Sequence, residues 1–303
     1  MRHIFFSGSK NFTVTIWASL MLALSLALTG TALASDQAVR EPDSISMWNG
    51  NKTASRQTYE REVLEAVLTA TEAVYGAWTL KEDKTDYPAA EDEASVFRKG
   101  FDIFGTVAGN QKLASEQKIL VPLPLMKGLL GYRVLIIRTE DKAKFAAITK
   151  ADDLQALKLG IPATWADAEL FRQNGYAVVE KGSFDELFER LLKKEFDYVS
   201  FGANEVAGVF TERAASSGKL MIDNSLLVYY PFPLVFYVNP QKPALARRVT
   251  AGLQKISANG VLDGIFNRYY GKALAELNID KRTRITLENS ILPKEMSGFK
   301  SSL

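Results

Sequence analysis

The side chains able to do chemistry in this 303-residue chain are limited by its composition. It has no cysteine, and its only histidine, His3, lies within an N-terminal segment that has the pattern of an export signal. A thiol nucleophile, a disulfide, a zinc site built on Cys or His and a Ser-His-Asp triad are therefore excluded from the rest of the chain. Carboxylate or lysine chemistry remains possible. Because there is neither a glycine-rich phosphate loop nor an EF-hand spacing, we predict no cofactor and no metal.

The segment TWADAEL is the first candidate for ligand contact. Thr164 can cap a helix, with Asp167 at the third position, which is a capping pair that stabilises a helix by about 1 kcal/mol. Alternatively, the free backbone N–H groups of this helix start could hold an anion. Trp165 could stack on the ligand or pack in the core.

A second group of candidates lies where predicted strands end. Asn204 and Glu205 follow one strand, and Glu205 could accept a ligand ammonium group or favour the positive end of the next helix. Four more candidates lie in the first half of the chain. Trp48 and Asn49 end the first strand, Thr106 ends the third, and Lys112 follows it. For these four, core, turn or surface packing is the alternative interpretation.

The middle of the chain alternates strand and helix signals from Gly131 to Val206, which is typical of an α/β sheet flanked by helices. Ser183 and Glu186 have capping-box spacing, and Asn174-Gly175 should end the preceding helix. The predicted strands are Tyr132–Ile137, Leu159–Ile161, Tyr176–Val179 and Asp197–Phe201, with helices beginning near Thr164 and Ser183.

The flanking regions predict a second α/β unit. Proline and glycine punctuate Leu120–Gly131 and Tyr229–Pro233, where the chain should cross between the two units. The tail after Gly271 is polar and is expected to be irregular. The remaining predicted elements are strands Ser44–Trp48, Trp78–Lys81, Phe101–Val107 and Leu234–Val238, helices Gln57–Tyr75, Ala94–Lys99 and Ala244–Ser257, and a loop over Glu82–Asp92.

Four segments carry a family resemblance: GYRVLIIR, GIPATWADAEL, SFDELFERLL and FDYVSFGANEV. In this order they resemble the second lobe of periplasmic solute-binding proteins of family 3, which have the type II fold of amino-acid ABC importers. The resemblance extends from about Ser44 to Gly271. It implies two α/β lobes, each a mainly parallel sheet flanked by helices, and two crossover hinge segments beside a ligand cleft. We expect residues 44–130 to form the first lobe, 131–232 the second, 233–271 the return to the first, and 272–303 a tail.

Two departures from the family pattern concern the ligand. The family's carboxylate-clamping arginine lies after the strand that is here Phe101–Val107, but this chain offers only Lys112 and Lys118 there. Lysine supplies charge without the planar fork of arginine. The family's amino-group acceptor is an aspartate near the position of Gly202 and Ala203. The resemblance therefore does not imply binding of an ordinary α-amino acid.

The N-terminus has the pattern of a cleavable export signal. Arg2 and Lys10 precede an apolar run from Ile16 to Leu28, and Ala32-Leu33-Ala34 forms a small-residue cleavage site. An uncleaved membrane anchor is the alternative, although the run is shorter than the roughly 20 residues needed to span a bilayer. Cleavage of residues 1–34 would leave a mobile lead-in at 35–43. It would lower the formal net charge from +2 to zero, which gives no reason to expect a nucleic-acid partner.

These patterns together predict a monomeric periplasmic solute-binding protein rather than an enzyme. Its ligand would be a small polar molecule, and its partner an ABC permease or a membrane sensor. One alternative is an enzyme on the same fold that uses Glu205 or Asp167 as a general acid or base. The other is a degenerate lobe pair that serves protein interaction.

Overall fold

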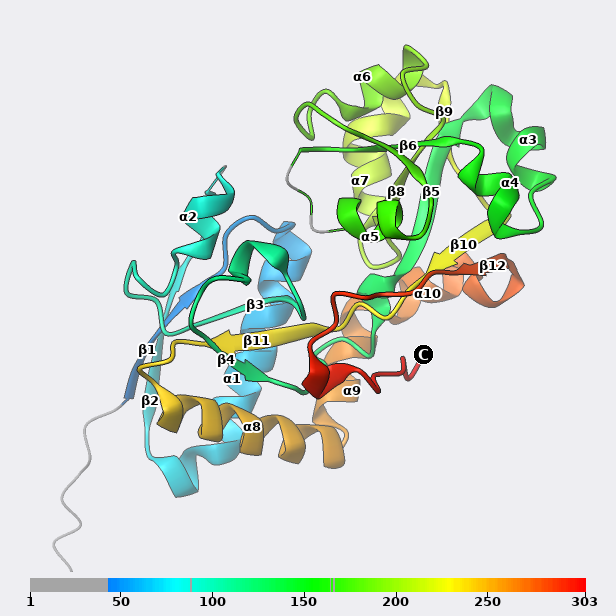
Figure 1. Ribbon diagram of the computed structural model, residues 1–303. Helices are drawn as coiled ribbons and strands as arrows, with labels where there is room; N and C mark the ends of the chain where they lie inside the picture. Colours follow the sequence, from blue (N-terminus) through cyan, green and yellow to red (C-terminus); the bar gives the residue numbers. More distant parts are fainter. Residues whose placement is uncertain (1–42, 88, 164, 166) are drawn as a thin grey trace, which may run out of the picture. The chain divides into compact units, whose positions relative to one another are not determined.

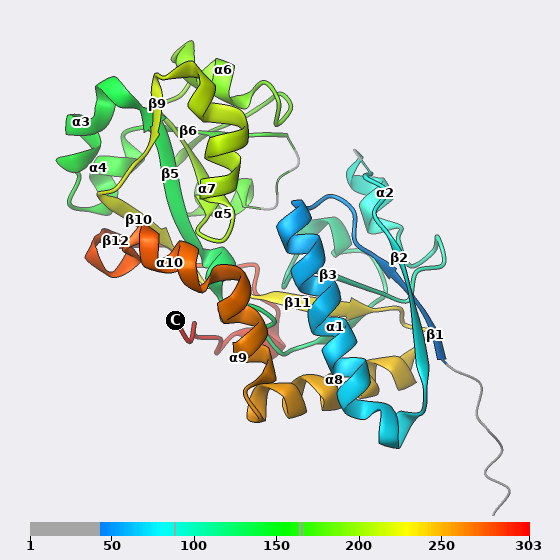
Figure 2. The same ribbon diagram turned by 180° about the vertical axis from the view of Figure 1, so that it is seen from behind.

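A computed structural model describes residues 43–87, 89–163, 165 and 167–303 of the chain (Figures 1 and 2). The expected export signal and nearly all of the expected lead-in lie outside the described residues, as does the candidate Thr164. Two mixed sheets organise the described part, and we use "lobe 1" and "lobe 2" for the five-stranded and the seven-stranded sheet with their helices. The predicted two-lobed α/β fold is confirmed.

Lobe 1 has the strand order β2-β1-β3-β11-β4. The pairs β2–β1 and β1–β3 are parallel, whereas β11 runs antiparallel to both β3 and β4 because it enters from the opposite lobe. Its strands are β1 (Asp43–Trp48), β2 (Trp78–Asp83), β3 (Ile103–Val107), β4 (Ile119–Val121) and β11 (Leu234–Val238). Its α-helices are α1 (Ala54–Tyr75), α2 (Ala90–Ala94), α8 (Pro243–Ala258) and α9 (Val261–Phe266).

The long helix α1 is defined by its caps and by one buried face. The Thr53 hydroxyl accepts a hydrogen bond from the Arg56 N–H at the N-terminus, and Gly76, with φ of 91°, ends the helix. The buried face, which includes Tyr59, packs against α8, as Figure 2 shows. The two helices approach closely at Gly252, where a Cβ would lie 2.6 Å from the Val67 side chain.

Lobe 2 has the order β12-β10-β5-β8-β6-β7, with β9 pairing with β5. The pairs β8–β6, β6–β7 and β10–β12 are parallel and those of β5 are antiparallel, so the expected parallel arrangement holds for only part of each sheet. Its strands are β5 (Tyr132–Arg138), β6 (Lys158–Ile161), β7 (Ala177–Glu180), β8 (Tyr198–Gly202), β9 (Leu220–Ile222), β10 (Leu226–Tyr229) and β12 (Thr283–Thr286). Its α-helices are α3 (Lys142–Ala146), α4 (Ala151–Gln155), α5 (Ala168–Gln173), α6 (Leu187–Leu192) and α7 (Val206–Val209).

Several boundaries differ from the sequence prediction. The helix expected at Ala94–Lys99 is instead α2, displaced toward the N-terminus, where three acidic residues in its first turn suit the positive end of a helix. Ile119–Val121 forms the edge strand β4 although the following stretch is rich in proline. The helix after Thr164 begins only at Ala168, and the one after Ser183 begins at Leu187, with Glu186 accepting hydrogen bonds from both the Ser183 N–H and hydroxyl.

The tail prediction was wrong in a more consequential way. The chain after Gly271 continues as α10 (Lys272–Leu277) and then as β12, which pairs with β10 over four residues. In Figure 1 the tail, drawn in red, runs from β12 to a short 3-10 helix at Lys294–Met296. Within the described residues the chain therefore crosses between the lobes at the two expected segments and again on either side of β12.

The two expected crossings touch each other at the hinge. The Tyr230 N–H donates to the Gly131 carbonyl at 3.1 Å. A Cβ on Gly131 would lie 1.9 Å from the Tyr230 carbonyl oxygen, so only glycine permits this approach.

No helix of the described residues is long and apolar enough to cross a membrane.

Candidate functional site

A buried ion pair lies at one end of the lobe 2 sheet. The Arg133 guanidinium, from the start of β5, bonds to the Asp167 carboxylate, and the Tyr230 hydroxyl donates to the same carboxylate at 3.0 Å. The Arg133 and Asp167 side chains are only 6% and 5% exposed. Burial works to lower the pKa of Arg133, but Asp167, Tyr230 and Glu205 together outweigh it and the pKa is raised. Asp167 is thus held by a partner within the protein.

The same pair changes the interpretation of TWADAEL. Asp167 precedes the first residue of α5, and its side chain makes no capping hydrogen bond to the helix. Its carboxylate is bonded to Arg133, and the predicted capping pair with Thr164 lies partly outside the described residues. A carboxylate at this helix start also disfavours an anion there, because like charges repel.

Trp165 is half-buried and packs against aromatic side chains of lobe 2. Its ring centroid lies 5.8 Å from that of Phe184 and 5.7 Å from that of Phe201, the latter edge to face. These contacts support the interpretation that much of the Trp165 ring packs in the core. The exposed remainder is still able to stack on a ligand, so its role in binding stays a prediction.

Asn204 and Glu205 follow β8, as expected. Glu205 is partly exposed and precedes α7, where its Oε1 accepts from the Gly202 N–H at 3.3 Å without capping the helix. A Cβ on Gly202 would lie 2.3 Å from the Asn204 Oδ1, so the Asn204 amide folds back over the glycine. That oxygen is buried and finds no hydrogen-bond partner among the described residues. A ligand that donates a hydrogen bond could therefore satisfy the Asn204 oxygen.

Lobe 1 places a charged cluster beside the carboxyl end of β1. The Lys52 ammonium donates to the Asn49 Oδ1 at 2.9 Å and to the Glu60 Oε2 at 2.5 Å, and Arg56 Nε donates to the other oxygen of Glu60 at 2.7 Å. Asn49 is fully buried, and its amide also donates to the Gln57 carbonyl and the Glu82 carboxylate. Burial lowers the pKa of Lys52, and the neighbouring Arg56 acts in the same direction.

A second polar network surrounds the carboxyl end of β3. The Asn110 amide donates to the Thr106 hydroxyl at 3.0 Å and to Glu93 at 3.1 Å. Lys112 completes it with an ion pair to Glu93 at 2.8 Å. Thr106 and Lys112 therefore belong to one network through Asn110 and Glu93, but Lys112 is neutralised by a carboxylate of its own lobe.

Trp48 belongs to a separate core of lobe 1. It is 1% exposed, donates to the Thr85 carbonyl at 2.9 Å and stacks on Tyr87 with ring centroids 5.5 Å apart. A side chain buried to this extent cannot contact a ligand in this conformation, which favours the packing alternative.

Tyr270 connects the electrostatics of the two lobes. It follows α9, and its ring centroid lies 5.1 Å from that of Tyr59 on α1. Burial raises its pKa, and Glu60 and Glu205 act in the same direction. Glu60 of lobe 1 and Glu205 of lobe 2 thus act on the same tyrosine hydroxyl.

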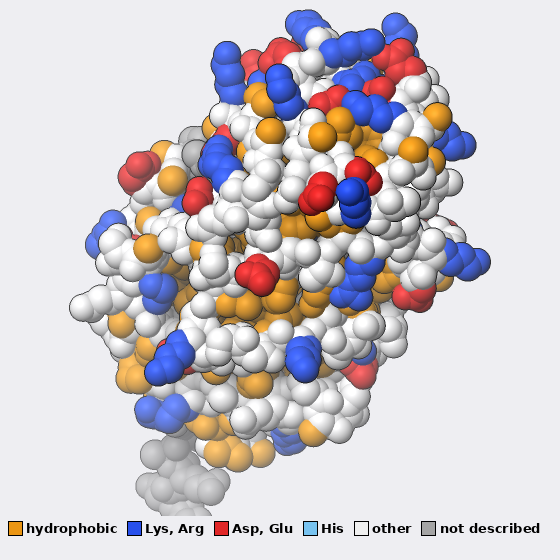
Figure 3. All heavy atoms as spheres, turned by 45° about the vertical axis from the view of Figure 1, so that its right-hand side comes forward, with side chains coloured by type: hydrophobic (Ala, Val, Ile, Leu, Met, Phe, Trp, Pro, Cys, Tyr) orange, Lys and Arg blue, Asp and Glu red, His pale blue; other side chains and the backbone are white. Residues whose placement is uncertain are grey.

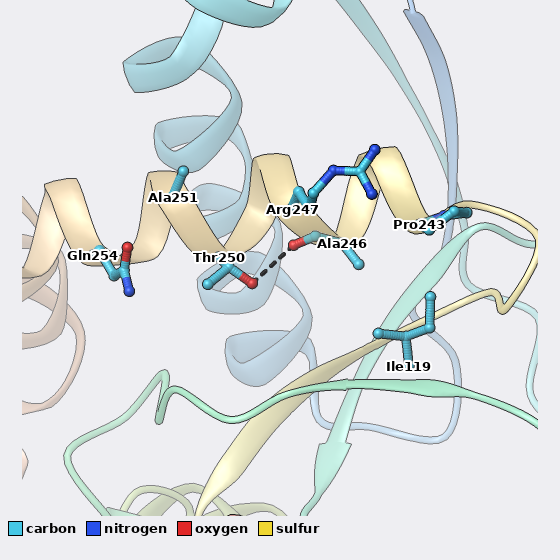
Figure 4. A pocket seen from close by; sticks show the side chains of 7 residues that line it. All are labelled: Ile119, Pro243, Ala246, Arg247, Thr250, Ala251 and Gln254. Atoms are coloured by element: carbon cyan, nitrogen blue, oxygen red, sulfur yellow. Dashed lines mark hydrogen bonds between the residues drawn. The ribbon is translucent and has the colours of Figure 1, made fainter.

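Two surface hollows lie elsewhere on lobe 1. One, of about 440 Å³, lies between α8 and the edge strand β4, and Figure 4 shows its lining of Ile119, Pro243, Ala246, Arg247, Thr250, Ala251 and Gln254. The other, of about 540 Å³, includes Glu116, Tyr237 and Pro293 in its lining. Neither contains a predicted ligand residue. On the face shown in Figure 3, acidic and basic side chains are interspersed rather than gathered by sign.

Sequence reasoning missed the charged residues that pair inside each lobe: Lys52, Arg56, Glu60, Glu93 and Arg133. Only Arg133 stands in an apolar run, where a charge is a signal that a buried partner exists, whereas the other four stand in polar stretches that give no such signal. The partner of Arg133, Asp167, lies far away in sequence, as does Lys112, the partner of Glu93. Among the described residues, no group of three acidic or histidine side chains is placed to hold a metal ion.

Comparison with known proteins gives the fold but no close relative. No family model and no curated protein matches the sequence. A periplasmic His/Glu/Gln/Arg/opine family-binding protein from Silicibacter pomeroyi, in complex with lysine, aligns with a TM-score of 0.53 at 12% identity, covering 76% of this chain and 97% of that one. An amino acid ABC transporter substrate-binding protein from Streptococcus pneumoniae, bound to L-arginine, gives 0.53 at 17% identity, covering 78% and 98%. The VFT2 domain of BvgS from Bordetella pertussis gives 0.54 at 16% identity, covering 75% and 93%.

These structures establish the class of fold. This chain has the two-lobed α/β fold of periplasmic binding proteins, including solute-binding proteins of amino acid ABC transporters. At such low identity the likeness defines the fold and leaves the ligand open.

Proposed function

We propose that this protein is a periplasmic solute-binding protein that captures a small polar molecule between its lobes. The observation that carries the proposal is the two-lobed fold with polar side chains gathered at the ends of strands in both lobes. Small ligands bind beside the carboxyl ends of strands in such α/β sheets. The captured solute would be delivered to an ABC permease or reported to a membrane sensor.

The ligand class follows from which groups are already paired. Lys112 is bonded to Glu93, Lys52 to Glu60, and Arg133 to Asp167. A carboxylate ligand would have to compete with these internal carboxylates for the basic groups. A flexible lysine also binds a carboxylate less well than arginine does, because it lacks the planar fork. We therefore propose a polar ligand that is not an ordinary α-amino acid, contacted by Trp165, Asn204 and Glu205.

A melting-temperature screen of periplasmic metabolites tests this proposal. A ligand at 100 times its dissociation constant stabilises the folded state by about 2.7 kcal/mol, which raises the melting temperature by about 5 to 10 °C for a chain of this size. The true ligand should give this shift with the wild type and a much smaller one with Trp165→Ala and Glu205→Gln. The exposed Glu212→Gln is the matched control and should keep the full shift. A full shift from glutamine, glutamate or another common amino acid, retained in both site variants, would refute the proposed site and ligand class together.

A protein-interaction role is the second candidate, and the internal pairing in lobe 1 favours it. Asn49 is completely buried, and the Lys112 charge is neutralised, so the strand ends of this lobe offer few free polar groups. If the screen finds no ligand, while a protein partner is captured that no longer binds after mutation of Glu205, the interaction role is supported instead.

A further inference from the structure

The last 21 residues of the chain contact both lobes. At their start, β12 pairs in parallel with β10, from Leu226 opposite Thr283 to Tyr229 opposite Thr286. The Leu287 N–H then donates to the Tyr229 carbonyl at 2.8 Å, and the Leu287 side chain is buried. This part of the tail is a full member of the lobe 2 sheet.

The helix α5 secures the tail immediately after β12. The Asn174 amide donates to the Glu288 carbonyl at 2.8 Å and accepts from the Glu288 N–H at 2.9 Å, so one side chain closes both backbone groups. Ser290 is also hydrogen-bonded to Gln173 of α5. The tail thus leaves lobe 2 from a fixed position.

The next residues cross the hinge and reach lobe 1. The Asn289 amide donates to the Pro231 carbonyl at 2.7 Å, which ties the tail to the crossing between β10 and β11. The Ile291 carbonyl then lies against Gly109, where a Cβ would come within 1.9 Å of it. Gly109 follows β3, so this contact is already on lobe 1.

The end of the tail is anchored in the second core of lobe 1. Met296 is 4% exposed and belongs to the cluster that contains Trp48, Phe104 and Tyr237. Leu292 and Phe299 pack against the same cluster. The Ser301 hydroxyl finally donates to the Lys127 carbonyl at 2.7 Å, on the first crossing segment.

We propose that residues 283–303 form a strap that fixes the spacing of the lobes and opposes hinge motion. The two hinge segments alone would leave the lobes free to rotate about them, and the segment through α10 that precedes β12 is the only other connection before the strap among the described residues. The strap is a fourth connection, hydrogen-bonded in lobe 2 and buried in lobe 1, and it must detach or bend before the lobes can move. The strap therefore holds the ligand-free protein in one arrangement and has to yield when the lobes close. This inference does not depend on the identity of a ligand.

Pulsed electron paramagnetic resonance between the lobes tests the strap. The chain contains no cysteine, so spin labels attach only at introduced positions. Lys81→Cys on β2 and Lys193→Cys after α6 are exposed sites in lobe 1 and lobe 2. With the wild-type tail, the distance distribution should be narrow and have one maximum. Met296→Asp, which places a charge in the apolar anchor, should broaden it by about twofold or more, because a buried unpaired charge is strongly unfavourable. Glu295→Ala, at the adjacent exposed position, should leave it unchanged.

A second variant guards against an anchor that stays docked or a protein that misfolds. Release of the tail by Met296→Asp is checked by trypsin cleavage after Lys294. The second variant is a chain that ends at Glu288, which removes the anchor while keeping β12 and the Asn174 contact. The circular dichroism of this shortened chain should match that of the wild type. A distribution as narrow as the wild type in the released or shortened protein would overturn the proposal. A broadened one supports it.

Discussion

The buried pair between Arg133 and Asp167 makes the sharpest prediction about stability. Both side chains are nearly inaccessible to water, at 6% and 5% exposure, and the Asp167 carboxylate also accepts from Tyr230. Asp167→Asn keeps the shape and an oxygen for Tyr230 but leaves the guanidinium charge without a counter-ion. Breaking a buried pair in this way costs about 3 to 5 kcal/mol. The melting temperature should fall by about 10 °C.

Urea unfolding followed by circular dichroism measures this loss. The double variant Arg133→Met with Asp167→Leu removes both charges and should be far more stable than either single variant, because no unpaired charge remains. The exposed pair Arg213–Asp185 provides the control, and Asp185→Asn should change the free energy of unfolding by less than about 1 kcal/mol. If Asp167→Asn lowers the free energy of unfolding by no more than this control does, the assignment of a buried, strongly interacting ion pair is refuted.

Two further predictions concern pH and export. Asp197 has a pKa below its ordinary value of 3.8, because hydrogen bonds from the Lys158 N–H and the Lys144 ammonium outweigh its burial, which acts to raise the pKa. A lowered folded-state pKa stabilises the fold above the unfolded value and is lost as the pH falls through the folded value. The free energy of unfolding of the wild type should therefore exceed that of Asp197→Asn by about 1.5 kcal/mol at pH 7, and the difference should shrink as the pH falls below 3.8 and through the lower folded-state value. Mass spectrometry of a periplasmic extract should find the mature N-terminus at Ser35, and recovery of intact Met1 only in membranes would contradict export with cleavage.

The strap and the hinge together suggest why the tail is structured at all. The close contact between Gly131 and Tyr230 places the first two crossings side by side, and Asn289 fastens the tail to the same point through Pro231. Three segments that meet at one hinge restrict rotation more than two do. The free energy needed to detach the strap is therefore part of the free energy of lobe closure. A ligand has to offset this cost by binding the closed state more tightly than the open one.

The sequence by itself determined most of the regular elements, because their signals are local. The strand Leu234–Val238 was predicted at its observed bounds, and the helix end at Asn174-Gly175 follows from a glycine that adopts φ of 80°. Periodicity and caps report on residues within a turn or two, which suffices for elements and, through their order, for the two-lobed fold.

The tertiary structure alone decided which charges neutralise one another. Asp167 has the spacing of a helix cap, and only the fold brings Arg133 close enough to form a hydrogen-bonded ion pair with its carboxylate. The sequence of the strand Thr283–Thr286 shows no apolar alternation, and Ile285 is its only buried residue. This strand forms because β10 offers an edge with which it can pair. Pairing between distant charges and recruitment of a polar edge strand depend on contacts between residues far apart in the chain, and no local pattern encodes them.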